Sequence, residues 1–166
     1  MFRGSITVCK TLTALTALAL LAGCASLSPF STLTKLDLKL TASAQVNPDL
    51  HGRASPIVVR LFELKHSAAF ENTDFFSLYH RANESLTPDL VLGEELELQP
   101  GQSVDLKLKV AEDSRYVGVI AAYRDLPKST WRYTVPITAL EVTEADLTLD
   151  KAGIRNTHQA LTQAED

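Results

Sequence analysis

Alternating apolar and polar residues predict β-strands along most of the chain. Over residues 35–42 every second residue is apolar, so one face of a strand is expected to be buried. Residues 57–64 are largely apolar at both odd and even positions, which is typical of an interior strand covered on both faces. Three more segments have the length and composition of strands: residues 116–123, 131–138 and 146–156.

A turn signal joins two further alternating segments. Residues 96–98 precede the turn, and Pro100 and Gly101 occupy the two central positions of residues 99–102. Residues 104–110 then alternate again between apolar and polar. We therefore predict a β-hairpin here.

Small residues and one proline refine this picture. Gly118, Ala121 and Ala122 within the segment 116–123 predict close packing against a neighbouring layer. Pro136 cannot donate a backbone hydrogen bond, so the segment 131–138 is expected at a sheet edge or at a bulge.

Residues 67–82 break the alternation and predict one or two short helices. The segment contains no Gly or Pro, and Phe75, Leu78 and Tyr79 have the spacing of one helical face. The candidate N-cap residues are Ser67 for a first helix and Asn72 or Thr73 for a second. With about seven or eight short antiparallel strands, the pattern indicates a mainly β protein, a β-sandwich with a small helical insertion.

The first 23 residues have the features of a removable export signal. Arg3 and Lys10 supply its basic region, and residues 11–22 contain only Leu, Ala and Thr. A helix that crosses a membrane needs about 20 apolar residues, so this stretch is too short to be one. We predict a signal peptide over residues 1–23.

The signal ends in a lipidation motif. Residues 21–24, Leu-Ala-Gly-Cys, match at every position the lipobox of bacterial lipoproteins, in which the cysteine thiol receives a diacylglyceryl group. Cys24 is therefore the predicted lipidation site, and Ala25, where an Asp would retain the protein at the inner membrane, indicates the outer membrane. Residues 24–34 are expected to be a short tether, followed by the β-sandwich domain over residues 35–166. The alternative is an ordinary signal peptide with an incidental cysteine.

Charge and cysteine content narrow the function further. Without Arg3 and Lys10, the chain has 14 Lys and Arg residues against 20 Asp and Glu, a net charge of −6. Because the sequence has no visible basic patch, nucleic acid is not an expected partner. Cys9 leaves with the signal and Cys24 carries lipid, so no disulfide is expected to stabilise the domain.

The sequence carries no motif for catalysis or metal binding. Its four histidines do not have the spacing of zinc ligands. Nucleophile elbows, Walker loops and dinucleotide-binding glycine motifs are also absent from the sequence. We therefore expect no catalytic residue, no metal and no cofactor.

One connection is longer than a hairpin requires. Residues 47–56 link the first two predicted strands, and Pro48 and Pro56 restrict the backbone at its two ends. A restrained loop with an exposed Leu50 can present a binding surface at a low ordering cost. An ordinary connection is the other interpretation.

A second group of residues, close to the predicted strand over 116–123, favours structural roles. Trp131 is expected to close the end of the core. Arg124 or Arg132 is expected to stack on an aromatic ring or to pair with Asp125.

The order and spacing of several blocks resemble the type VI secretion lipoproteins known as TssJ. The resemblance covers about residues 35–154, and its most specific block is residues 116–126, followed by Trp131-Arg132. The other matching residues are Leu21-Ala22-Gly23-Cys24, Asn47-Pro48, Gly52, residues 56–64, Phe70, Asp74-Phe75-Phe76, Leu78 and Leu98-x-Pro100-Gly101.

The resemblance implies a transthyretin-like β-sandwich with a structural role and no enzymatic activity. Such proteins anchor the trans-envelope complex of the secretion system to the periplasmic face of the outer membrane. Their partner is the periplasmic C-terminal region of the inner-membrane protein TssM, which also associates with TssL. In the family, the loop between the first two strands contributes to this contact, and it corresponds to about residues 45–56 here. The implied partner-binding residues are Asn47, Asp49, Leu50, His51 and Arg53.

Two other functions stay open. A periplasmic small-ligand-binding lipoprotein with a transthyretin-like sandwich would need a deep apolar pocket lined by a few polar groups. An envelope hydrolase would need a nucleophile and a base in contact, and the sequence offers no motif for such a pair.

Overall fold

The computed structural model of the chain describes residues 33–157. The predicted signal peptide, Cys24 and nearly all of the predicted tether lie outside these residues. The elements, in chain order, are β1 (Lys35–Ala42), β2 (Ile57–Leu64), α2 (Ala68–Asn72), α3 (Phe75–Ser85), β3 (Leu90–Leu98), β4 (Ser103–Lys109), β5 (Tyr116–Ala121), the 3-10 helix η2 (Leu126–Lys128), β6 (Arg132–Pro136), β7 (Val142–Leu149) and β8 (Ile154–Asn156).

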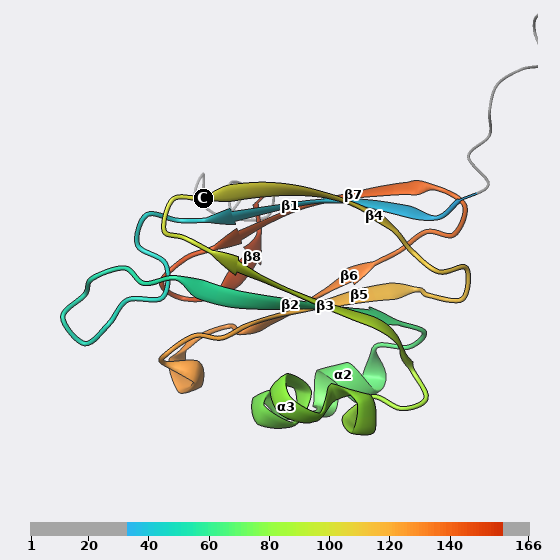
Figure 1. The fold of residues 1–166 in the computed structure, drawn as a ribbon, viewed down its shortest axis with the longest axis horizontal. Coiled ribbons are helices and arrows are strands. Elements are labelled where there is room, and N and C mark those ends of the chain that lie inside the picture. The colour runs from blue at the N-terminus through green and yellow to red at the C-terminus, as the bar shows by residue number, and fades with distance from the viewer. Residues whose placement is uncertain (1–32, 158–166) are drawn as a thin grey trace, which may run out of the picture. The chain divides into compact units, whose positions relative to one another are not determined.

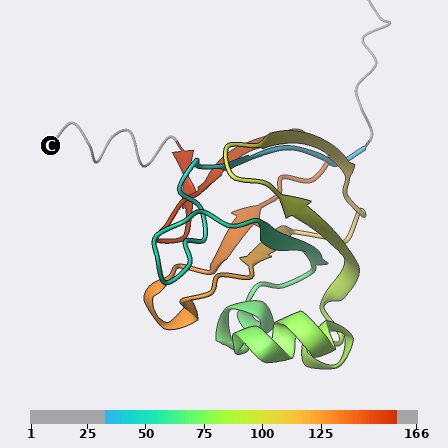
Figure 2. The same cartoon turned by 60° about the vertical axis from the view of Figure 1, so that its left-hand side comes forward.

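The strands form two four-stranded sheets, with the orders β4-β1-β7-β8 and β3-β2-β5-β6. The sheets face each other, and the helices lie against the outer face of the second sheet (Figure 1; Figure 2). The predicted β-sandwich with a helical insertion is confirmed. The strand directions differ from the expectation, because β1 and β7 run parallel whereas the other paired strands are antiparallel.

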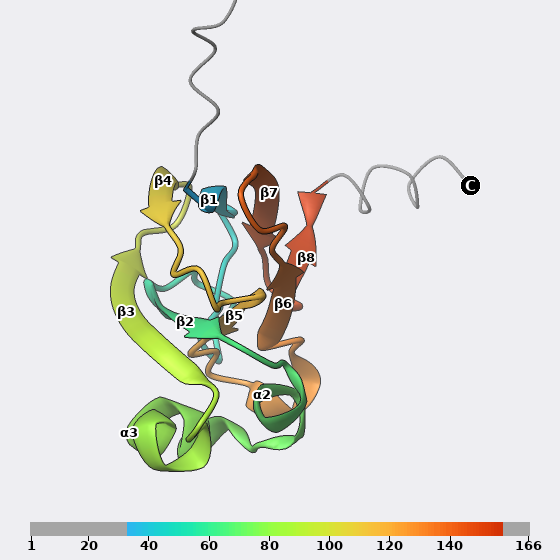
Figure 3. The ribbon, with the colours of Figure 1, turned by 90° about the vertical axis from the view of Figure 1, so that its right-hand side faces the viewer.

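The period-two alternation of β1 places its apolar side chains in the core between the sheets. Leu36, Leu38, Leu40 and Ala42 are at most 1% exposed, whereas the residues between them are half-buried or exposed. The end-on view in Figure 3 shows β1 in the middle of its sheet, above the second sheet. Burial of one face therefore fixes the register of this strand.

β2 is covered on both faces, as its sequence predicts. Val59 packs into the core between the two sheets, and Phe62 packs into a second apolar cluster beneath the helices. This second cluster consists of Phe62, Leu64, Phe70, Phe75, Leu78, Leu86 and Ile120. The molecule thus has three layers, and β2 belongs to the middle one.

The helices agree with the predicted insertion in position but not in their capping. Ser67 precedes α2 but makes no side-chain capping hydrogen bond. The N-cap of α3 is Asp74, whose carboxylate accepts a hydrogen bond from the Ser77 amide at 3.1 Å, and not Asn72 or Thr73. Thr73 instead lies at the C-terminal end of α2, where its hydroxyl donates to the carbonyl of Ala69.

The predicted hairpin over residues 96–110 is wrong, although its turn is present. Gln102 donates to the Gln99 carbonyl at 3.0 Å, and Gly101 has a φ of 80°. The strands on either side pair in different sheets, β3 with β2 and β4 with β1. Both strands point apolar side chains into the same core from opposite sides, so their alternation resembles that of a hairpin. The turn is a corner between the sheets.

The segment 146–156, predicted as one strand, contains the end of β7 and all of β8. A turn separates the two strands, and in it Asp150 accepts hydrogen bonds from the amides of Ala152 and Gly153. A Cβ at Gly153 would lie 2.6 Å from the Thr130 backbone, so this position requires glycine. β6 lies at the edge of its sheet and ends at Pro136, as the proline predicts.

Gly118 allows the helical layer to approach the sheet, as the small residues of β5 predict. A Cβ at this position would lie 2.7 Å from two ring carbons of Phe70, which is fully buried. We expect Gly118→Ala to lower the free energy of unfolding by about 1–3 kcal/mol, because the ring cannot retreat without moving α2. Urea denaturation measures this change.

Gly93→Ala is the matched control for Gly118→Ala. A Cβ at Gly93 would meet Phe62 at 3.6 Å, which is an ordinary van der Waals distance. Its effect on the free energy of unfolding should stay within about 0.5 kcal/mol. Equal stability of the two variants would show that the layer of α2 is not tightly packed.

Candidate functional site

The connection between β1 and β2 extends from one end of the sandwich (Figure 1). At its base, Asn47 is 4% exposed and has a φ of 46°. Its Nδ2 donates to the carbonyl of Pro56 at 2.9 Å, and its Oδ1 accepts from the amide of Arg124 at 2.9 Å. Asparagine suits this position, because it tolerates the left-handed backbone and bonds two separate segments. Asn47 therefore fixes the base of the loop.

The Asp49 carboxylate organises the tip of the loop. It accepts hydrogen bonds from the amides of His51 and Arg53 at 2.8 and 2.9 Å, and it pairs with the Arg53 guanidinium at 2.7 Å. Gly52 donates to the Asp49 carbonyl at 2.9 Å and has a φ of 77°, so the chain reverses here. The hydrogen bond from the Arg53 amide is the main cause of a lowered pKa of Asp49, so the carboxylate is ionised at neutral pH.

The two central residues of this turn, Leu50 and His51, point their side chains to solvent. Leu50 is 103% exposed, the highest value among the exposed large apolar residues of residues 33–157. A single exposed leucine is ordinary on a protein surface. Here, however, the backbone that carries it is held at both base and tip. A partner could therefore contact this side chain with little loss of conformational entropy in the loop.

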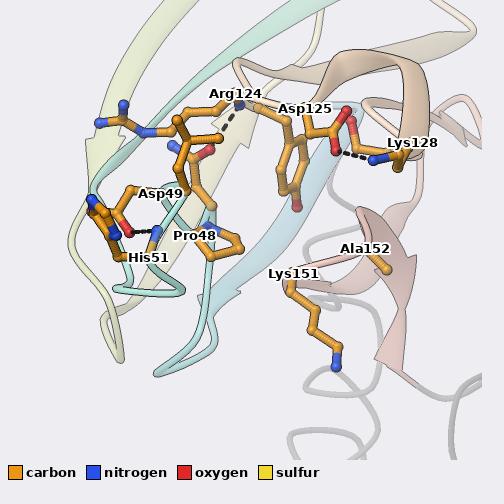
Figure 4. Close-up of a pocket in the computed structure, with 12 residues that line it drawn as sticks. Pro48, Asp49, His51, Arg124, Asp125, Lys128, Lys151 and Ala152 are labelled. Carbon is orange, nitrogen blue, oxygen red and sulfur yellow. Dashed lines mark hydrogen bonds and ion pairs between the residues drawn. The ribbon is translucent and has the colours of Figure 1, made fainter.

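A groove of about 870 Å³ separates the loop from two other segments. Figure 4 shows Pro48, Asp49 and His51 on one side, Asp125 and Lys128 above, and Lys151 and Ala152 opposite. The ammonium of Lys128 lies 3.2 Å from the Asp125 carboxylate. The complete lining is Asn47, Pro48, Asp49, Leu50, His51, Tyr123, Arg124, Asp125, Lys128, Ser129, Lys151 and Ala152.

Tyr123 lines the groove and carries an unsatisfied polar group. The residue is 5% exposed, and its hydroxyl has no hydrogen-bond partner among residues 33–157. Burial raises the pKa of this hydroxyl well above its usual range, so it remains a neutral donor at physiological pH. A buried hydroxyl without a partner is unfavourable and is uncommon in folded proteins.

The structure separates the five predicted partner-binding residues into two groups. Asn47 is buried and Asp49 is bonded within the loop, whereas Leu50, His51 and Arg53 are exposed. Sequence reasoning did not assign Tyr123, Arg124, Lys128 or Lys151 to this surface. These residues are far from the loop in sequence, and the contact between Asn47 and Arg124 joins positions 77 residues apart.

Trp131 and Arg132 have the structural roles that the sequence favours. Trp131 is half-buried and packs edge-on against Phe75, with ring centroids 5.3 Å apart. The Arg132 guanidinium lies 4.3 Å from the centre of the Trp131 ring and donates to the carbonyls of Phe70 and Thr73. Arg132 therefore attaches the helices to β6, while Asp125 pairs with Lys128 and not with an arginine.

Among residues 33–157 no group of three or more His, Cys, Asp or Glu side chains is placed to hold a metal ion. No helix in this part of the chain is long and apolar enough to cross a membrane.

We expect Asn47→Ala to destabilise the fold and to loosen the loop. The change leaves the Pro56 carbonyl and the Arg124 amide without their partner and places alanine at a left-handed φ. The free energy of unfolding should fall by about 1–3 kcal/mol, and amide hydrogen exchange should accelerate over residues 47–56. Gln45→Ala changes an exposed residue of the same loop and serves as the control. Unchanged exchange in Asn47→Ala would mean that other contacts fix the loop.

Comparison with known proteins identifies the family. A family model described as "Type VI secretion lipoprotein, VasD, EvfM, TssJ, VC_A0113" matches residues 34–152. The structure of the type VI secretion lipoprotein TssJ1 from Pseudomonas aeruginosa is 34% identical, with a TM-score of 0.74 over 75% of this chain and 95% of that one. No curated protein gives a significant sequence match.

Two other solved structures are similar. Lip from Serratia marcescens, a membrane-bound component of the type VI secretion system, is 31% identical, with a TM-score of 0.70 over 75% of this chain and 97% of that one. A chain of a type VI membrane complex is 25% identical, with a TM-score of 0.66 over 75% of this chain and 98% of that one. This chain belongs to the type VI secretion lipoprotein family, TssJ.

Proposed function

We propose that this protein anchors the type VI secretion membrane complex to the outer membrane by binding the periplasmic C-terminal region of TssM. The acyl chains on Cys24 hold it at the periplasmic face, since several chains give stable attachment where one does not. The loop over residues 45–56 contacts TssM, and TssL joins the complex through TssM. The protein acts by binding and performs no catalysis.

The fully exposed side chain of Leu50 on a restrained loop is the observation that best supports this proposal. The bonds of Asn47 and Asp49 order the loop before any partner arrives. The adjacent groove provides a concave surface beside the projecting leucine. A projecting apolar residue beside a groove with charged residues at its edge suits recognition of a protein surface.

Direct binding tests the proposal. A fragment of residues 32–166 is immobilised, and the periplasmic region of TssM from the same genome is passed over it in a biolayer interferometry experiment. We expect saturable binding at equimolar stoichiometry. If a fragment with a cooperative thermal transition does not bind TssM, the family assignment stands and the proposed partner is wrong.

A small-ligand carrier is the second candidate, and one observation favours it. The groove volume of about 870 Å³ lies within the usual range for small-molecule sites, and the Tyr123 hydroxyl could donate to a ligand. Native mass spectrometry of the purified protein distinguishes the two functions. A stoichiometric added mass that disappears on denaturation would support the carrier, and its absence together with TssM binding would support the anchor.

Sorting to the outer membrane is tested by Ala25→Asp. In enterobacterial sorting, Asp after the lipidated cysteine retains a lipoprotein at the inner membrane. We expect the variant to move from the outer-membrane to the inner-membrane fraction on a sucrose gradient, while its lipidation is unchanged. Ala25→Ser is the matched control and should remain in the outer membrane. An Ala25→Asp protein that still sediments with the outer membrane would show that residue 25 does not direct sorting in this organism.

A further inference from the structure

Exposed apolar side chains gather at the end of the sandwich where β1 begins. Leu33, Leu140 and Val142 are 44%, 61% and 48% exposed. Backbone contacts bring them together, because Lys35 is the register neighbour of Val142 and donates to the Glu141 carbonyl at 3.0 Å. We call these three side chains the apolar end patch.

The backbone of Leu140 is held in an uncommon conformation. Its φ is 62°, a left-handed value that glycine or asparagine adopts more easily than leucine. The Leu140 amide donates to the Thr34 hydroxyl at 3.0 Å, which ties this turn to the beginning of β1. The chain thus carries a large, exposed apolar residue at a position where the backbone would favour a small or polar one.

The distance to the proposed lipid attachment restricts what can cover this patch. Leu33 lies nine positions after Cys24, and an extended chain reaches at most about 3.3–3.6 Å per residue. Leu33 therefore stays within roughly 30 Å of the lipidated Cys24. Loop 45–56 follows the other end of β1, at the opposite end of the sandwich (Figure 1).

We propose that the apolar end patch rests on the lipid surface of the membrane that holds Cys24, with Leu140 and Val142 entering the head-group region. The patch is small, but the lipid anchor makes this contact intramolecular and raises its effective concentration. Lys35 and Lys109, register neighbours beside the patch, can meet lipid phosphates. Docked in this way, the domain directs loop 45–56 away from the membrane and toward a periplasmic partner. The inference rests on the proposed lipid anchor but not on the proposed partner.

A polarity-sensitive fluorophore on Leu140→Cys tests this contact. In the mature protein the new thiol would be the only free one, because Cys9 is removed with the signal and Cys24 carries lipid. Full-length lipidated protein is labelled with a nitrobenzoxadiazole probe and placed in vesicles of phosphatidylethanolamine and phosphatidylglycerol. We expect a blue-shifted emission that spin-labelled lipids quench. Leu50→Cys, at the opposite end, should show neither change.

Each other outcome would overturn the proposal in a distinguishable way. Vesicle-bound protein whose probe at position 140 is not quenched would show that the patch does not meet lipid. A blue shift without quenching by lipids would indicate that a second copy or the chain's own N-terminal segment covers the patch. Protein that does not bind vesicles at all would refute the lipid anchor itself, and binding of TssM by the same sample would show that the partner proposal survives.

Discussion

We expect the replacement of Cys24 by alanine to release the protein from the membrane fraction and to stop type VI secretion. The variant has no thiol at position 24 to receive the diacylglyceryl group, so the proposed acyl chains cannot be attached. Without several chains the affinity for a bilayer is marginal at best. Fractionation, intact-mass measurement and the release of secreted proteins into the medium measure the three expected losses.

Two comparisons separate loss of the anchor from loss of the fold. Cys9→Ala changes the other cysteine, which lies in the predicted signal peptide, and this variant should be lipidated and active. The soluble Cys24→Ala protein should still bind the TssM region, because residues 33–157 are unchanged. Normal secretion by a Cys24→Ala protein found only in the soluble fraction would refute anchoring as the mechanism.

Local sequence patterns predicted the strands because burial acts on them directly. In β1 one face meets the core, so its apolar residues alternate, and all four are buried. In β2 both faces are covered, so apolar residues occur at both parities. Gly118 also predicted close packing correctly, because a glycine in a buried strand leaves room for a neighbouring group, here the Phe70 ring.

The sequence did not predict which strands pair with each other. The turn at residues 99–102 was predicted correctly, but β3 and β4 enter opposite sheets. Alternation reports which face of a strand is buried and not which neighbour it bonds. The parallel pairing of β1 with β7 likewise joins segments more than a hundred residues apart, and no local signal specifies it.

The candidate site shows the same limit. Its loop could be predicted from its length, its prolines and the family resemblance. The other residues that line the groove could not be predicted, because Arg124 and Lys151 lie near the loop only in the folded domain. The Tyr123 hydroxyl has no hydrogen-bond partner among residues 33–157 because of how the domain packs, and the sequence 116–123 predicts only a strand there. Asn47 was predicted to bind the partner, whereas in the structure its side chain bonds to Pro56 and Arg124 and so fixes the base of the loop.

We expect Leu50→Asp to weaken TssM binding by about 30-fold or more, which corresponds to about 2 kcal/mol or more for a central apolar contact. The substitution removes the projecting apolar side chain and adds a charge that the interface would have to desolvate. Leu50 is fully exposed in the free protein, so the free energy of unfolding should change by no more than about 0.5 kcal/mol. Titration of the TssM region in biolayer interferometry and urea denaturation measure the two quantities.

The matched control is Leu140→Asp in the same soluble fragment. Leu140 is also exposed, it lies at the other end of the domain, and its left-handed backbone accepts aspartate. Equal affinity of Leu140→Asp and the native fragment, together with weak binding by Leu50→Asp, would place the contact on loop 45–56. If the folded Leu50→Asp fragment binds as tightly as the native one, TssM binds elsewhere. In that case the order imposed by Asn47 and Asp49 would have only a structural purpose, and the interpretation of this loop as an ordinary connection would be the correct one.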